Sequence, residues 1–499
     1  MRPRGPWIVA GLLFVVLMVL ASRYGFHRDE FYFIEGGRHP DWAQPDNPIL
    51  IPLLATAWHD LVGGNLIAFR ILPALAGAGT ILIAAATARQ LGGTDRQQTI
   101  TALVTALSSF PMAIGHLFSI STFDLLLTSA VIMLLIRALR TPDRLPGWLW
   151  LGVITGIALE VKVLPALVLA CCLAGLLLLG PRAPLARPGP WIAAGIALLL
   201  AAPNLIWQAV HGFPMREIAA NIAAGGSASS ADRIMIIPMH LLLIGPLLSV
   251  LAIAGLVATF VVPRLRDHRW VALAYLLLLI IIVITGGKPY YQAGLFPVAL
   301  ALGVIAVSGW LLRVVWRRIV AIALLVVVSV PTAAFSLPVA PVGSTVFEIA
   351  AAVNPDSAET VGWDDFTETA VRVAARIPAA DRADAIVLAS NYGEAGSLAR
   401  ARRLDLSTPA GPAGALPPIY SGHNAFGAWG PPPAAVRTAV VIGEFDQAEL
   451  DRWFSRCEPV EEFASPPGVD NEEDGAPFRL CTGMLRPWPE LWPEVRRLG

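Results

Sequence analysis

Residues 27–52, HRDEFYFIEGGRHPDWAQPDNPILIP, form a polar island in an otherwise apolar chain. The island carries adjacent carboxylates at Asp29 and Glu30 and further acids and histidines, with aromatic side chains between them. An apolar run precedes it and many more follow. This pattern predicts a membrane scaffold that holds an acidic loop at one surface, and we interpret the loop as half of an active site.

The composition indicates a membrane protein. Of the 499 residues, 56% are hydrophobic and only 14% are charged, with a mean hydropathy of +0.65. Soluble domains carry about 25% charged residues. Lys plus Arg and Asp plus Glu balance at 36 each, so the net charge gives no reason to expect a nucleic-acid partner. No Cys/His spacing of the metal-binding type occurs.

Eleven apolar segments are predicted to cross the membrane. The first follows Arg2 and Arg4, and we interpret it as an uncleaved helix because no convincing cleavage site precedes His27. Residues 48–63 are too short for a crossing, which takes about 20 residues, and are typical of an amphipathic interfacial helix. The predicted crossings are approximately 6–22, 66–88, 98–117, 124–139, 148–161, 163–180, 191–210, 235–262, 270–286, 291–311 and 319–338.

The positive-inside rule selects this number of crossings. With the amino end in the cytoplasm, eleven crossings place all the basic loop clusters on the cytoplasmic side. Joining residues 148–180 into one helix would move the last two clusters outside. We therefore predict a multi-pass plasma-membrane protein whose carboxyl-terminal domain is extracytoplasmic. The outer side then carries Asp29, Glu30, Asp124 and the only two lysines of the chain, Lys162 and Lys288.

The pattern changes from about residue 339. Segments 385–390 and 438–445 have the composition of β-strands, and charged stretches at 364–376 and 446–455 are typical of helices. Pro- and Gly-rich turns separate them. These features predict a small α/β domain.

The chain is therefore divided into a transmembrane domain, residues 1–338, and an extracytoplasmic α/β domain, residues 339–499. The second is long enough to form its own core. On the outer side Cys457 and Cys481 would be able to form a disulfide, which the sequence alone leaves open.

Three acidic residues are candidates for chemistry. Asp29 and Glu30 follow a membrane helix and stand beside His27 and Arg28, a setting in which a carboxylate can remove a proton from a hydroxyl. The alternative is a solvated loop start. Asp124 is expected near a helix start, where it would cap the helix or favour its dipole unless neighbouring hydroxyls already do so.

The cationic candidates lie at predicted helix ends. Lys162 either extends its ammonium group to the interface, pairs with Glu160, or holds a lipid phosphate. Lys288 lies in GGKPYYQAG, where the glycine backbone and Tyr290 are suited to bind an anion. The alternative is that the tyrosines form part of an interfacial aromatic belt. Arg70 is an intramembrane charge, which by default indicates function.

The order of these motifs resembles that of the polytopic GT-C glycosyltransferases, specifically the bacterial relatives of protein O-mannosyltransferases and lipid A aminoarabinose transferases. The resemblance covers residues 6–338. It rests on DEFYF and HPDW…PDNP in the first outer loop, RILPALAG from Arg70, STFDLLL around Asp124, LEVKVLPALVLA around Lys162 and KPYYQAGLFP from Lys288.

The resemblance implies a polyprenyl-phosphate-linked sugar donor, mannose or another hexose or pentose, and an acceptor hydroxyl that enters from outside. It implies that Asp29 is the catalytic base, acting with inversion, with Glu30 as its neighbour and Asp124 as a second acid near the donor. The donor phosphate would be bound by Arg70, Lys162, Lys288 and Tyr290. No cofactor is required, and a divalent metal is compatible with the acids although no ligand spacing demands one.

The carboxyl-terminal segment does not resemble the MIR domain of the eukaryotic mannosyltransferases, so the acceptor is left open among glycan, lipid and protein. Membrane lipid is a further expected partner. Two rival classes remain, a lipid or sugar transporter or flippase and a non-catalytic envelope scaffold. A transporter predicts charges on broken helices near the bilayer midplane, whereas here the acids and lysines gather at one face.

Overall fold

The computed structural model describes residues 3–225 and 231–499, and the chain divides into two compact units. The first unit consists of Met1–Ala21, Arg70–Val210 and Ala219–Leu337, and the second of Ser22–Phe69, His211–Ile218 and Pro338–Gly499. The acidic loop thus belongs to the same unit as the carboxyl-terminal residues. The division at residue 338 predicted from the sequence separates the acidic loop from the carboxyl-terminal residues, whereas contacts in space group them in one unit.

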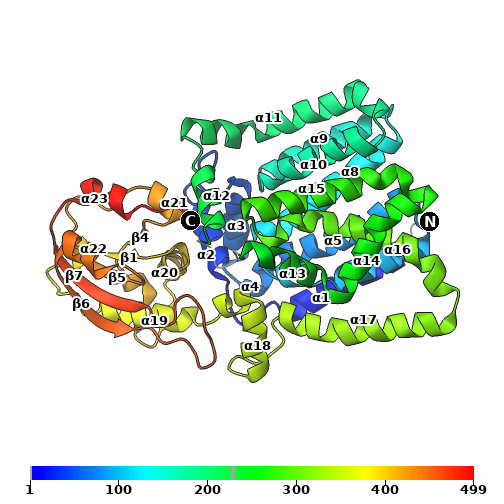
Figure 1. The fold of residues 1–499 in the computed structure, drawn as a ribbon. Coiled ribbons are helices and arrows are strands. Elements are labelled where there is room, and N and C mark those ends of the chain that lie inside the picture. Colours follow the sequence, from blue (N-terminus) through cyan, green and yellow to red (C-terminus); the bar gives the residue numbers. More distant parts are fainter. Residues whose placement is uncertain (1–2, 226–230) are drawn as a thin grey trace. The chain divides into compact units, whose positions relative to one another are not determined.

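Apolar helices build the first unit (Figure 1, blue to green). They are α1 (Gly5–Leu20), α5 (Ile71–Gln90), α6 (Asp95–Ala106), α7 (Ser109–Gly115), α8 (Ile120–Arg140), α9 (Leu145–Leu159), α10 (Leu164–Leu179), α11 (Pro188–Val210), α13 (Arg233–Ile244), α14 (Pro246–Val261), α15 (Arg269–Thr285), α16 (Phe296–Leu312) and α17 (Val315–Ser336). The 3-10 turns η1 (Ala183–Ala186), η2 (Pro263–His268) and η3 (Pro289–Leu295) connect some of them, and α12 spans Met215–Ala223.

Six helical segments of the described chain are long and apolar enough to cross a membrane, and eight if the bent pairs α6–α7 and α13–α14 each form one span. α1, α9 and α10 are shorter apolar helices. Each of the eleven segments expected from the sequence coincides with one of these helices or bent pairs, but the number of crossings stays a prediction. Residues 148–180 form two helices, α9 and α10, rather than one.

Small residues allow close helix packing in this unit. A Cβ atom on Gly255 of α14 would lie 2.2 Å from the backbone nitrogen of Gly303 on α16, so only glycine permits this approach. Membrane helices commonly associate through such small residues. By contrast, α17 exposes Val326, Val327 and Val330, as expected of a helix that faces lipid.

The second unit contains three helices from the acidic loop, α2 (Arg28–Gly36), α3 (Leu50–Leu61) and α4 (Leu66–Phe69). α3 lies within the segment for which an amphipathic helix was expected. Its other helices are α18 (Thr345–Val353), α19 (Trp363–Ala374), α20 (Tyr392–Leu404), α21 (Asn424–Ala428), α22 (Gln447–Trp453) and α23 (Trp488–Val495), with 3-10 turns η4 (Pro355–Thr360), η5 (Arg382–Asp384) and η6 (Ala413–Ala415).

A five-stranded sheet in the order β4-β1-β5-β7-β6 forms the centre of the carboxyl-terminal domain (Figure 1, yellow to red). β1 is parallel to both of its neighbours, and β7 is antiparallel to β5 and β6. The strands are β1 (Ala385–Ala389), β4 (Ile419–Ser421), β5 (Thr438–Ile442), β6 (Phe454–Glu462) and β7 (Pro477–Met484), with a separate ribbon of β2 (Ser407–Thr408) and β3 (Gly411–Pro412).

Helices cover both faces of this sheet. Because side chains alternate along a strand, Phe478 and Cys481 of β7 point to opposite faces. Phe478 contacts Phe366 of α19, with ring centroids 5.3 Å apart. Cys481 belongs to a core cluster with Leu450 of α22 and Trp488 of α23. The α/β domain expected from the sequence is thus present.

The two cysteines of this domain form a disulfide. Cys457 of β6 and Cys481 of β7 are paired across the antiparallel strands, and their sulfur atoms are bonded. This settles the pairing that the sequence left open. Cys171 and Cys172 are buried free thiols in α10.

Candidate functional site

Helix α2 begins with a capping box that fixes the acidic pair. The His27 side chain accepts a hydrogen bond from the backbone N–H of Asp29, and the Glu30 carboxylate accepts one from the backbone N–H of His27. Each bond satisfies a donor that a helix start would leave unpaired. Glu30 is fully buried, so its carboxylate already has a structural task. Its expected role beside the acceptor stays a prediction.

Asp29 presents its carboxylate to a residue of the carboxyl-terminal domain. The Tyr392 hydroxyl donates a hydrogen bond of 2.9 Å to Asp29 Oδ1, across a sequence separation of 363 residues. Tyr392 is the first residue of α20, directly after β1 and the Ser390–Asn391 turn. Asp29 is only partly buried, so part of the residue is accessible to solvent.

Arg28 is a buried cation surrounded by three glutamates, of which Glu359 and Glu473 are buried and Glu472 is exposed. Its guanidinium group forms ion pairs with Glu472, with Glu359 at 3.4 Å and with Glu473 at 3.9 Å. It also lies over the ring of Tyr392, 5.1 Å from the centroid. One arginine therefore joins the loop to two segments of the carboxyl-terminal domain and to the tyrosine that binds Asp29.

Burial shifts several acids of this cluster toward their neutral forms. Burial, together with the neighbouring Glu473, raises the pKa of Glu359 to about 7 against the effect of Arg28. Burial likewise raises the pKa of Glu473 to about 7. Glu394 of α20 has a pKa of about 7 for the same reason, although hydrogen bonds from Asn391 and Ser390 act in the opposite direction. Perturbed carboxyl groups of this kind gather at functional sites.

A second tyrosine, Tyr32, forms hydrogen bonds within the loop and with the carboxyl-terminal domain. Tyr32 donates a hydrogen bond of 2.8 Å to Asp46, and its oxygen accepts one of 3.2 Å from the backbone N–H of Ala425. Burial raises the pKa of Asp46 to about 6. His39 stacks on Trp429 with ring centroids 4.0 Å apart. These contacts shape the loop around Asp29.

The first unit contains a separate group of candidate residues. Lys162, in the turn between α9 and α10, forms an ion pair of 3.6 Å with Asp124. Asp124 also accepts a hydrogen bond of 2.8 Å from Thr128. The helix start is capped by Ser119, whose side chain accepts from the backbone N–H of Thr122. The structure therefore removes the interpretation of Asp124 as a helix cap.

Both lysines approach the same aromatic ring. The Lys162 ammonium group lies 5.1 Å from the centroid of Tyr290 and 4.9 Å from that of Tyr291, and Lys288 lies 5.9 Å from Tyr290. These distances suit cation–π contact. The structure thus brings together Lys162, Lys288, Tyr290 and Asp124, which the sequence singled out separately. It adds Tyr291.

Arg70 is buried at the start of α5. Its guanidinium group donates a hydrogen bond of 2.9 Å to the backbone carbonyl of Ala21, which follows the last residue of α1. A cation at a helix carboxyl end is favoured by the helix dipole. This contact gives Arg70 a structural task, and its expected contact with a donor phosphate stays a prediction.

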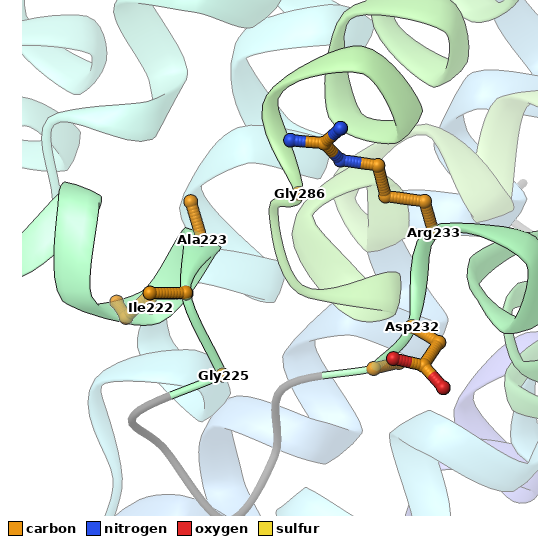
Figure 2. A pocket seen from close by; sticks show the side chains of 8 residues that line it. Ile222, Ala223, Gly225, Asp232, Arg233 and Gly286 are labelled. Carbon is orange, nitrogen blue, oxygen red and sulfur yellow. The ribbon is translucent and has the colours of Figure 1, made fainter.

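Two further features complete the description. Among the described residues, no group of three or more His, Cys, Asp or Glu side chains could hold a metal ion. Figure 2 shows an open pocket beside the ends of α12 and α13, with the carboxylate of Asp232 and the guanidinium group of Arg233 at its wall. None of the residues singled out from the sequence lines it. The pocket is lined by Ile222, Ala223, Ala224, Gly225, Ala231, Asp232, Arg233 and Gly286.

Sequence reasoning missed Tyr392 and the glutamates around Arg28. A local signal did exist for the helix start, because Asn391 and Glu394 form a capping box at α20. No local pattern indicates that the next tyrosine reaches Asp29.

Comparison with known proteins gives a family match over part of the chain and a shared fold. Residues 46–207 match the family model of dolichyl-phosphate-mannose-protein mannosyltransferases. No curated protein matches the sequence.

Solved structures resemble the whole chain. ArnT from Cupriavidus metallidurans bound to undecaprenyl phosphate matches with a TM-score of 0.58 and 15% identity, covering 96% of this chain and 98% of that one. Its apo structure gives a TM-score of 0.59 and 14% identity, over 95% and 97% of the two chains. The match to archaeal oligosaccharyltransferase AglB from Archaeoglobus fulgidus covers 78% of this chain and 62% of that one at 12% identity, with a TM-score of 0.49.

Proposed function

We propose that this chain is a multi-pass membrane glycosyltransferase of the GT-C type, which transfers a sugar from a polyprenyl-phosphate donor to an acceptor hydroxyl. The observation that carries the proposal is the partly exposed Asp29 carboxylate, held at the first turn of α2 within a fold shared with ArnT. A carboxylate in this setting is suited to act as a general base.

Asp29 takes the proton of the acceptor hydroxyl as the oxygen attacks the anomeric carbon. The bond between that carbon and the phosphate oxygen breaks, and the polyprenyl phosphate leaves with the electron pair. Attack from the face opposite the phosphate inverts the anomeric configuration. A phosphate needs no acid catalyst to leave, so one base is sufficient for proton transfer.

Lys162 and Lys288 stabilise the charge that develops on the leaving phosphate. The support for this role is that the only two lysines of the chain approach one ring, Tyr290, in the first unit. Asp124 holds Lys162 in place through their ion pair of 3.6 Å. Arg70 is the fourth residue proposed for the donor phosphate, in addition to its contact with α1.

The donor sugar is proposed to be mannose or another hexose or pentose, and the acceptor a glycan, lipid or protein outside the cytoplasm. The amino end would lie in the cytoplasm and the carboxyl-terminal domain outside. The bond between Cys457 and Cys481 supports that orientation, because disulfides persist in oxidising compartments.

The test is a transfer assay with the purified full chain in lipid nanodiscs. Polyprenyl-phosphate mannose labelled in the sugar is supplied together with a cell-envelope acceptor fraction, and both labelled product and released polyprenyl phosphate are measured. The proposal expects the two to appear in equal amounts. In a parallel assay with the full chain reconstituted in vesicles, movement of labelled donor across the membrane without glycosyl transfer would instead establish a transporter.

A further inference from the structure

We propose that Tyr392 is a positioning residue for glycosyl transfer, which holds the Asp29 carboxylate by its Oδ1 atom so that Oδ2 can take the acceptor proton. The inference rests on the proposed function and deepens it. It assigns the carboxyl-terminal domain a direct part in preparing the base.

The geometry leaves Tyr392 little freedom. Its ring is 4.6 Å from that of Tyr32 and 5.0 Å from that of His423, and Arg28 lies over it. Neighbours on several sides fix the direction of the hydroxyl, which donates the bond of 2.9 Å to Asp29. In the described part of the chain this is the hydrogen bond found for the Asp29 carboxylate, and it occupies Oδ1 alone.

The place of Tyr392 in the fold strengthens the inference. The connection after β1 leads to β4 on one side, and the chain then continues to β5 on the other. In open α/β sheets, ligands bind beyond the carboxyl ends of the strands at such a change of direction. Here Tyr392 follows β1 and His423 follows β4 at that edge. Helix α2, which carries Asp29, takes the place that a ligand has in such a sheet.

Tyr392 acts as a donor rather than as a base. Burial raises its pKa well above the ordinary value, and Asp29 raises it further, whereas Arg28 lowers it. The phenol therefore keeps its proton near neutral pH. The charged groups that act on this pair are Arg28 of α2 and Glu472 of the segment before β7, which act on Tyr392, and Asp46 of the loop, which interacts with Asp29.

The experiment is a double-mutant cycle on the full chain in nanodiscs, with polyprenyl-phosphate mannose as donor. Tyr392→Phe keeps the packed ring and removes only the hydroxyl. We expect kcat to fall about 10- to 100-fold, as for loss of a hydrogen bond to a charged group, with the donor KM unchanged. Tyr420→Phe, which removes a hydroxyl from β4 of the same domain, serves as the control and should retain wild-type kcat.

The cycle separates positioning from a general structural role. In an Asp29→Asn background, Tyr392→Phe should cause no further loss, because its effect passes through Asp29. Equal losses in both backgrounds, or wild-type kcat in Tyr392→Phe while Asp29→Asn is inactive, would overturn this inference and leave the proposed function standing. Full activity of Asp29→Asn would overturn the proposed function itself.

Discussion

The Lys162 group of the first unit and the Arg28 group of the second handle charge in different ways. Among the described residues, Lys162 pairs with one carboxylate, Asp124, and approaches the rings of Tyr290 and Tyr291. Arg28 has three glutamates around one guanidinium group. The first arrangement is sparse and contains Lys162, which is proposed to bind the donor phosphate. The second is dense and adjoins Asp29, which is proposed to accept the proton.

The difference follows from the surroundings of each group. Charges within a membrane domain are costly, so few occur and each has a partner or a function. A domain that faces water can carry many charges and bury some of them by packing. Burial then shifts Glu359 and Glu473 toward their neutral forms. The first group therefore suits the binding of an external anion, whereas the second suits the ordering of the loop that carries Asp29.

The largest effect on stability is expected from removing the central cation of the dense group. Arg28→Met leaves Glu359, Glu472 and Glu473 without their arginine. Breaking a buried ion pair by removing one partner costs about 3–5 kcal/mol. Hydrogen exchange of the carboxyl-terminal domain should report this loss, in particular in peptides covering β1 and α20.

A matched control is Arg38→Met, which removes a more exposed pair with Asp60. Exposed pairs contribute about 0–1 kcal/mol. If Arg28→Met and Arg38→Met had equal small effects, the Arg28 group would not be a stabilising centre, and the contrast between the two regions would be lost.

Substitution of Lys162 in the sparse group is expected to lower the use of the donor and to leave the stability of the carboxyl-terminal domain unchanged. Lys162→Met removes one cation and leaves Asp124 where the donor phosphate is proposed to bind. We expect kcat/KM for the donor to fall about 100-fold, or about 2.7 kcal/mol in transition-state free energy. Adding Asp124→Asn should recover part of the loss, because the repulsion of the phosphate is removed. Unchanged donor dependence in Lys162→Met would contradict the phosphate role.

The smallest expected effect is a change in how stability depends on pH. Burial raises the pKa of Glu473 from 4.5 to about 7, so between these values the folded protein binds a proton that the unfolded chain has released. The contribution of Glu473 to the free energy of unfolding therefore falls as pH rises through this window and is constant above it. Glu473→Gln lacks this contribution.

We expect Glu473→Gln to gain about 1–3 kcal/mol relative to the wild type between about pH 5 and pH 8. Hydrogen exchange of β7 at several pH values measures the difference directly. Taking the difference between variant and wild type cancels the opposite trend of His59 and His423, whose pKa values burial lowers. Parallel curves for the two proteins would show that Glu473 does not titrate in this range.

Sequence reasoning was successful where a pattern is local or a residue is rare. Apolar runs marked the helices, and strand patterns at 385–390 and 438–445 correspond to β1 and β5. Lys162 and Lys288 stood out because the chain has no other lysine. Their common approach to Tyr290 depends on tertiary packing and was visible only in the structure.

The surroundings of Asp29 could not be predicted in the same way. Tyr392 lies 363 residues away in the sequence, and Glu472 and Glu473 resemble ordinary surface acids until burial is known. The capping task of Glu30 was within reach, but histidine is an unusual partner in a capping box and gave no clear signal. The grouping of the loop with the carboxyl-terminal domain was missed for the same reason, because it rests on long-range contacts.

The measurement that tests the central claim most directly compares Asp29→Asn with Asp41→Asn in the transfer assay. Asp29→Asn keeps the shape of the side chain and removes its ability to take a proton, and Asp41→Asn changes an exposed acid on the same loop. The account predicts a loss of at least about 100-fold in sugar transfer for Asp29→Asn, with normal transfer by Asp41→Asn. Normal transfer by Asp29→Asn would contradict the claim that Asp29 is the catalytic base.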